Sequence, residues 1–141
     1  MRVVLDTNVV VSGTFWTGAS FQVLKLVDRG RAVMIITLPI IREYDEIIHS
    51  EEILDKNTIV QQANIKIVQK LLSTAVLVQP LERISIVKND PDDDKFIEAA
   101  VEGKADYIIS QDHHLLDLKD FRGIKIVSPE EFLRLMKDNN L

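Results

Sequence analysis

The amino-acid sequence predicts a three-layer α/β/α sandwich with a central, mostly parallel sheet of about five strands. Short apolar segments of strand length alternate along the chain with segments whose apolar residues recur at helical spacing. This alternation is typical of a parallel sheet covered by helices on both faces. The length of 141 residues suits one domain spanning 1–141, and we find no repeat, low-complexity segment or linker that would divide it.

The expected strands are short apolar runs, and the first of them, Val3-Val4-Leu5, lies close to the N-terminus. Binding sites in open parallel sheets form beyond the carboxyl ends of the strands, so the residues that follow each strand matter most. The other expected strands cover residues 32–36, 75–78, 107–109 and 124–127.

The expected helices carry recognisable start and stop signals. Gly30 and Gly103 each follow a helical pattern and end it, whereas Pro39 and Thr58 suit the first turn and the N-cap of two others. The last helix opens with Ser128-Pro129-Glu130-Glu131, which is a capping box with proline at the first helical position. The expected helices are 20–29, 39–48, 58–72, 90–102 and one opening at 128, with a short helix or turn at 50–56.

Composition excludes several classes of protein. The chain has no cysteine, which rules out disulfides and thiolate metal sites and makes a reducing cytoplasm the expected location. No apolar run approaches the roughly 20 residues of a membrane span, so we expect no membrane partner. The net charge of −5 argues mildly against a nucleic-acid binder. A site that collects acids to hold a metal ion, however, makes the total charge more negative whatever it binds.

Acidic residues follow the strands at several separate places in the chain. Asp6 ends the first expected strand, Asp112 follows the fourth, and Glu43 lies early in the helix after the second. The run 92–94 is a triple Asp at the start of the helix that feeds the fourth strand. No Lys or Arg occupies these positions, so the carboxylates would repel one another unless a cation binds. Oxygen ligands without cysteine select Mg²⁺ or Mn²⁺, which can activate water for phosphodiester hydrolysis.

Each acid also has an ordinary structural explanation. Asp6 could satisfy loop amides, Glu43 could be solvated, and Asp112 could cap the turn that follows it. Asp92 and Asp93 favour the positive end of a helix, each by roughly 0.3–1 kcal/mol. Helix and strand capping gives no reason for all of these acids to reach one edge of the sheet, and their joint placement therefore favours a metal site.

Four segments, VVLDTNVVVSG, PIIREYDEIIHS, DPDDDKFIEAA and ADYIISQD, resemble in order and spacing those of the PIN domain, the nuclease fold of VapC-type toxins. The resemblance covers nearly the whole chain and is greatest to the toxin components of toxin–antitoxin systems. It implies that Asp6, Glu43, Asp94 and Asp112 are the catalytic, metal-holding acids, with Glu43 completing the set or orienting the attacking water. It also implies that Asn8 and Ser110 position Asp6, a ligand or a phosphate by hydrogen bonds.

The third acid remains open between two neighbours. Helical phase aligns Asp93 with the expected buried stripe, whereas the resemblance selects Asp94, which lies 16 residues before Ser110 (110 − 94). We take Asp94 as the ligand and keep Asp93 as an outer or alternative one. Related sequences often carry a further acid where this chain has His114, which we expect to be an outer group. This departure concerns a second metal ion more than the first.

The resemblance implies a metal-dependent endoribonuclease that cuts single-stranded RNA with Mg²⁺ or Mn²⁺. It further implies a homodimer that a cognate antitoxin protein holds inactive. The alternative is a catalytically inactive PIN-like module that binds RNA or protein. Phosphotransfer folds of similar topology fail at named positions, because Asn8 stands where a haloacid-dehalogenase-like phosphatase needs a second Asp, and Gln79-Pro80 stands where a receiver domain needs its phosphorylated Asp.

Other residues favour ordinary explanations. We expect His113 and His114 to be solvated, because adjacent residues on a helix do not face each other. We expect Lys95 to be solvated as well. Phe15-Trp16 is placed in a loop after Asn8, where an aromatic ring could stack on an unpaired base. The expected helix at 58–72 has extra apolar residues, Ile59 and Ile65, which fit either a dimer or antitoxin surface or a wider buried face.

Overall fold

Six strands form the central sheet of the computed structural model, which describes residues 1–15, 18–49, 59–87 and 91–139. The strand order is β3-β2-β1-β4-β6-β5. Every pairing in the sheet is parallel except that between β5 and β6, so the expected mostly parallel sheet is confirmed. The strands are β1 Arg2–Leu5, β2 Val33–Ile36, β3 Val76–Leu77, β4 Tyr107–Ile109, β5 Asp120–Phe121 and β6 Ile124–Val127.

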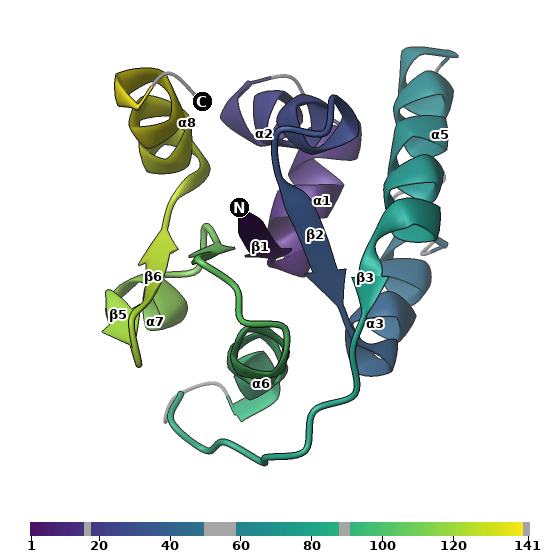
Figure 1. Ribbon diagram of the computed structural model, residues 1–141. Helices are drawn as coiled ribbons and strands as arrows, with labels where there is room; N and C mark the ends of the chain where they lie inside the picture. The colour runs from purple at the N-terminus through teal and green to yellow at the C-terminus, as the bar shows by residue number, and fades with distance from the viewer. Residues whose placement is uncertain (16–17, 50–58, 88–90, 140–141) are drawn as a thin grey trace.

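Helices cover both faces of this sheet, as Figure 1 shows with α6 on one side and α2 and α8 on the other. Contacts of α6 with β1, β2 and β4 place it against the centre of the sheet, and α2 contacts α8. No helix in the described ranges is long and apolar enough to cross a membrane. The helices are α1 Thr7–Phe15, α2 Ala19–Asp28, α3 Leu38–Ile48, α5 Ile59–Thr74, the 3₁₀ turn η1 Pro91–Asp93, α6 Asp94–Glu102, α7 His113–Leu116 and α8 Pro129–Asp138.

Two elements differ from the sequence-based expectation. The segment after Asp6 is the helix α1 and not a loop, so Phe15 ends a helix, while Trp16 lies outside the described residues. Its run of valines and its glycine disfavour a helix locally, but packing of α1 against α2, α3 and α5 overrides that preference. Gly13 is required for the close approach, because a Cβ there would lie 2.4 Å from Leu24 Cδ1. The second difference is β5, a two-residue edge strand that raises the strand number above five.

Several local predictions are confirmed. Ser128 caps α8, with its hydroxyl accepting a hydrogen bond from the amide of Glu131 at 3.1 Å. Gly103 is the C-cap of α6. Ile65 of α5 is half-buried in a small cluster with Val11 and Ile47, which fits the wider buried face. The expected helix or turn at 50–56, the cap Thr58 and the start of a helix at Asp90 lie outside the described residues.

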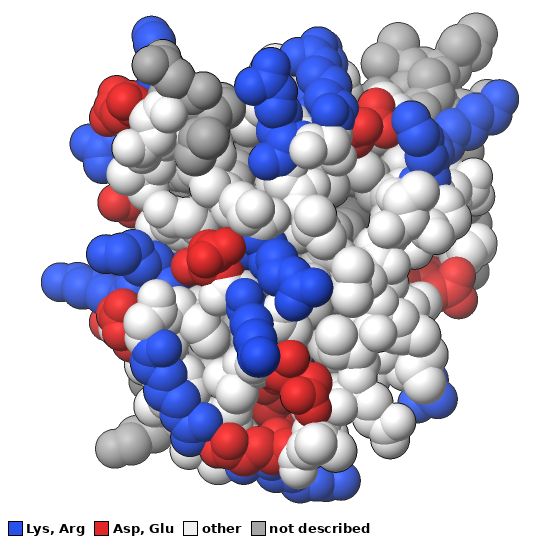
Figure 2. All heavy atoms as spheres, viewed as in Figure 1, with Lys and Arg blue, Asp and Glu red and all other residues white. Residues whose placement is uncertain are grey.

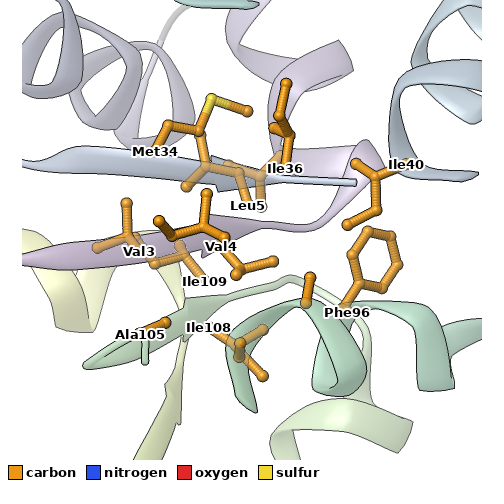
Figure 3. Packing of buried hydrophobic residues seen from close by; sticks show 14 of the residues in the cluster. Val3, Val4, Leu5, Met34, Ile36, Ile40, Phe96, Ala105, Ile108 and Ile109 are labelled. Carbon is orange, nitrogen blue, oxygen red and sulfur yellow. The ribbon is translucent and has the colours of Figure 1, made fainter. Parts of the chain in front are cut away.

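The core fixes the elements that carry the acids. Val4 and Leu5 of β1 and Ile109 of β4 are fully buried. Phe96 of α6 and Ile40 of α3 are also fully buried and point toward one another in Figure 3, where α3 and α6 meet. The middle of α3 therefore lies beside the carboxyl end of β1, and α6 packs against β1 and β4. This arrangement brings chain segments that are distant in sequence to one edge of the sheet.

Candidate active site

Asp6 lies at the carboxyl end of β1, beside Ser110 at the end of β4. The two strands pair in parallel with Leu5 opposite Ile109, and the amide of Asp6 donates to the carbonyl of Ile109 at 2.9 Å. The hydroxyl of Ser110 donates to Asp6 Oδ2 at 2.6 Å, and the amide of Asn8 donates to Asp6 Oδ1 at 3.3 Å. Both carboxylate oxygens are thus oriented by the local backbone and by the neighbouring strand.

The surroundings of Asp6 oppose its negative charge. Its side chain is buried, and this burial is the main reason that its pKa is raised. The hydrogen bonds from Ser110 and Asn8 lower the pKa in part, whereas the charges of Glu43 and Asp112 raise it further. A cation at this position would relieve both the burial cost and the repulsion.

Glu43, in the middle of α3, is held by two donors on one oxygen. The hydroxyl of Thr7 donates to Glu43 Oε2 at 2.6 Å, and Lys95 Nζ lies 3.0 Å from the same oxygen. The sequence has no Lys or Arg at the positions of the acids themselves, but the fold brings Lys95 to Glu43. The expectation of a solvated Lys95 is therefore wrong, because its side chain is only 13% exposed. Lys95 lies on α6, and the contact between α3 and α6 brings it to Glu43.

Lys95 also contacts Asp92, whose Oδ2 lies 3.0 Å from its Nζ. Burial alone would lower the pKa of Lys95, but its hydrogen bonds to Glu43 and Asp92 outweigh this and leave the pKa raised. The ammonium group therefore stays charged beside the site.

Asp112 follows β4 and caps α7. Its Oδ1 accepts a hydrogen bond from the amide of His114 at 2.9 Å, which is the capping role that the sequence left as an alternative. Its own amide donates to the hydroxyl of Ser110 at 2.9 Å, so Ser110 links Asp6 to Asp112. His114 Nδ1 lies 3.6 Å from Asp112 Oδ1, which fits an outer group, and His113 is exposed as expected.

Asp93, and not Asp94, faces Asp112. Burial of the Asp112 carboxyl opposes its ionisation, but a side-chain hydrogen bond with Asp93, together with the amide of His114 and the charges of both histidines, leaves its pKa lowered. Asp93 is itself 8% exposed, at the end of η1. Two carboxyl groups can share a hydrogen bond only if they hold a proton between them, and a cation could replace that proton.

Asp94 points instead to the extended segment before η1. Its Oδ1 accepts hydrogen bonds from the amides of Ile86 at 3.1 Å and Val87 at 2.8 Å. Two further acids of α6 hold the same segment, since Glu98 accepts from the amide of Ile84 at 2.9 Å and Glu102 accepts from Leu81 at 3.0 Å. Figure 2 shows acidic side chains gathered over α6 on one face of the molecule. In this structure Asp94 therefore belongs to a row of carboxylates that anchors residues 81–87.

The residues fit a hard divalent cation in their chemistry. Asp6, Asp93 and Asp112 offer only carboxylate oxygens, and the first is buried at a cost that positive charge would relieve. Among the residues that the structure describes, no three Asp, Glu, His or Cys side chains form a ready-made ion site. An ion would therefore have to draw these carboxylates closer together by side-chain rotation.

The sequence missed three residues of this site. Thr7 and Lys95 both bind Glu43, and the Tyr44 hydroxyl donates a hydrogen bond to the carbonyl of Leu5, just before Asp6. The spacing of three residues between Asp92 and Lys95 is typical of an ion pair on a helix. No local pattern in the sequence indicates the contact of Lys95 with Glu43. Asn8 is exposed and contributes its backbone amide to Asp6.

Ser110→Ala is expected to weaken Mn²⁺ binding by about 10- to 100-fold while the protein still folds, because removal of a group that orients a ligand typically has this cost. The change removes the donor to Asp6 and the acceptor for the Asp112 amide together. Isothermal titration with Mn²⁺ measures the effect, with Ser73→Ala, an exposed serine near the end of α5, as the matched control. Unchanged affinity in Ser110→Ala would contradict the role of Ser110 as a link between the acids.

The chain is similar to known proteins in sequence. A family profile described as PIN domain matches residues 2–114, which is most of the chain. The chain is 29% identical to the uncharacterized protein MJ1680 of Methanocaldococcus jannaschii over 142 residues, covering 94% of this chain and 90% of the relative.

Two solved structures share the fold. PAE2754 from Pyrobaculum aerophilum superimposes with a TM-score of 0.60 at 14% identity, covering 98% of this chain and 90% of the other. VapBC2 from Rickettsia felis, solved bound to a DNA fragment from its promoter, gives a TM-score of 0.55 at 12% identity, covering 91% of this chain and 98% of the other. At these identities the likeness concerns the fold alone.

Proposed function

The chain belongs to the PIN-domain family, and we propose on this basis that it is a metal-dependent endoribonuclease that cuts single-stranded RNA. The observation that carries the proposal is Asp6, a buried carboxylate oriented by Ser110 at a strand end, with Asp112 and Asp93 beside it. Buried acids with raised pKa values are concentrated at functional sites, where a bound charge offsets their cost.

We propose that Asp6, Asp93 and Asp112 hold Mg²⁺ or Mn²⁺, with Glu43 orienting the attacking water. A bound divalent ion would supply an activated water and neutralise charge on the phosphodiester. Ser110 keeps Asp6 and Asp112 in position, and Thr7 and Lys95 fix Glu43. Asp94, which the family resemblance selects as third ligand, anchors the segment before η1 in our proposal.

The partners of the protein are part of the same proposal. We propose that the chain is a toxin with a cognate antitoxin partner, which its similarity of fold to a VapBC structure supports. We further propose that the antitoxin covers the site and that the chain forms a homodimer, as the family resemblance implies. Each of these is a property that co-expression and purification of the chain with the protein encoded beside it would test directly.

The direct test is cleavage of a mixed panel of structured and single-stranded RNAs by the purified protein in Mn²⁺, Mg²⁺ or EDTA. We expect cuts in single-stranded regions that require the metal ion and stop in EDTA. A folded protein that binds Mn²⁺ but cuts none of these RNAs would instead support the inactive binding module. Contaminating ribonuclease is recognised because its activity persists in EDTA or in a variant prepared in the same way.

A further inference from the structure

The most informative unassigned feature beside the acids is the half-buried side chain of Lys95. Its Nζ lies 3.0 Å from Glu43 Oε2, 3.0 Å from Asp92 Oδ2 and 3.0 Å from the carbonyl oxygen of Asp92. A lysine ammonium has three N–H donors, and these three acceptors use all of them. Lys95 is therefore fully engaged within the protein.

This contact differs from an ordinary surface ion pair. Exposed pairs contribute little, because solvent screens them and both side chains lose freedom. The Lys95 side chain is 13% exposed, and its Nζ lies 5.1 Å from the centroid of the ring of Phe96, which is fully buried. The anchored helix start and the packed ring hold the ammonium at one place beside Glu43.

The hydrogen bonds at Glu43 limit what this residue can do for an ion. Its Oε2 accepts from both Thr7 and Lys95, so the lone pairs of that oxygen are occupied. The charge of Glu43 is already compensated by the protein, whereas Asp6 and Asp112 have no ion pair with a Lys or Arg among the described residues. The positive charge that balances Glu43 is thus supplied by the side chain of Lys95 and need not come from a metal ion.

We propose that Lys95 takes the place of a second metal ion, so that the site binds one divalent cation per chain while Lys95 positions Glu43. This inference rests on the proposed metal site and deepens it. Removing the charge of Lys95 would leave Glu43 and Asp92 as unpaired carboxylates close together, which attract a cation from solution. The structure therefore links the identity of residue 95 to the number of bound ions.

The test counts Mn²⁺ ions per chain by electron paramagnetic resonance and isothermal titration, without any RNA. We expect one Mn²⁺ in the wild type, one in Lys95→Arg, and two in Lys95→Gln, the second binding more weakly. Lys137→Gln, an exposed lysine at the end of α8, is the matched control and should keep one ion. Two ions in the wild type, or one in Lys95→Gln, would overturn the proposal.

A second variant keeps the proposal testable if Lys95→Gln does not fold. Glu43→Gln should leave the affinity for the first Mn²⁺ within about threefold of wild type, a difference below 1 kcal/mol, because Glu43 is not one of its ligands in this proposal. A loss of tenfold or more would overturn it. The ion count is independent of RNA cleavage. One bound ion in a wild type that cuts no RNA would therefore contradict the proposed function but not the role of Lys95. Two bound ions in a wild type that does cut RNA would contradict the role of Lys95 but not the proposed function.

Discussion

Asp6→Asn is expected to abolish metal-dependent RNA cleavage, with a loss of about a thousandfold or more. The carboxylate is the most buried acid of the site and is held by Ser110 and Asn8 on its two oxygens. An amide keeps the shape and one acceptor oxygen but lacks the negative charge that holds a cation. A metal ion contributes several kcal/mol to transition-state charge stabilisation, and about 4 kcal/mol corresponds to a thousandfold in rate. Cleavage assays and Mn²⁺ titration of the same preparation measure both consequences.

The same substitution should leave the metal-free protein as stable as the wild type, or more stable, at neutral pH. Burial raises the pKa of Asp6 in the folded state, so its ionisation opposes folding. Its stabilising contribution is complete below the unfolded pKa and is lost as the pH rises through the higher folded pKa. Asp6→Asn removes this loss. Thermal unfolding in EDTA should therefore show the variant gaining on the wild type as the pH rises from the ordinary Asp value of about 3.9 to the higher folded pKa, and keeping that gain above it.

A matched control separates these effects from general damage. Asp138→Asn changes an exposed acid at the end of α8 and should keep both cleavage and Mn²⁺ binding. An Asp6→Asn protein that is folded and still cuts RNA would show that the acids are not the catalytic centre. A variant that melts well below the wild type in EDTA would show instead that Asp6 has a structural role.

The sequence predicted those parts of the site that depend on local pattern. The strand ends at Asp6 and Asp112 follow from short apolar runs in an alternating pattern, because the carboxyl ends of parallel strands meet at one edge. The capping box of α8 could likewise be predicted from the sequence, because its residues lie close together in the chain. The parallel sheet followed from the same alternation of elements.

The missed features depend on packing between distant segments. The pairing of Lys95 with Glu43 exists because α3 and α6 meet through Ile40 and Phe96, which no local signal reports. The helix α1 contradicts its own residue preferences and is stabilised by its neighbours. The two-residue strand β5 is too short for its pattern to be recognised.

The choice between Asp93 and Asp94 as a metal ligand stays a prediction, and substitutions at the two positions should have very different effects. Asp93→Asn is expected to weaken Mn²⁺ binding at least tenfold, whereas Asp94→Asn should retain it. The reason is that Asp93 contacts Asp112, while Asp94 Oδ1 accepts from the amides of Ile86 and Val87. An Asn at position 94 keeps an acceptor oxygen for these amides and loses only the charge. Titration of both variants with Mn²⁺ compares two neighbouring, equally buried carboxylates.

Asp94→Ala, unlike Asp94→Asn, removes the acceptor for the amides of Ile86 and Val87 and should therefore lower the stability of the protein. The buried amide of Val87 then loses its acceptor, which costs about 1–3 kcal/mol, and the part-buried amide of Ile86 loses its acceptor at a smaller cost. For a chain of this size, a total loss of about 2–4 kcal/mol lowers the melting temperature by roughly 5–15 °C. Because residues 81–87 lead to η1, their release should also disturb Asp93, so Mn²⁺ binding is expected to weaken together with stability. The opposite result, in which Asp94→Asn loses Mn²⁺ binding and Asp93→Asn keeps it, would show that Asp94 is the ligand, as the family resemblance implies. Asp94 would then not serve mainly to anchor residues 81–87, and that role would be left to the other carboxylates of α6, from Glu98 onward.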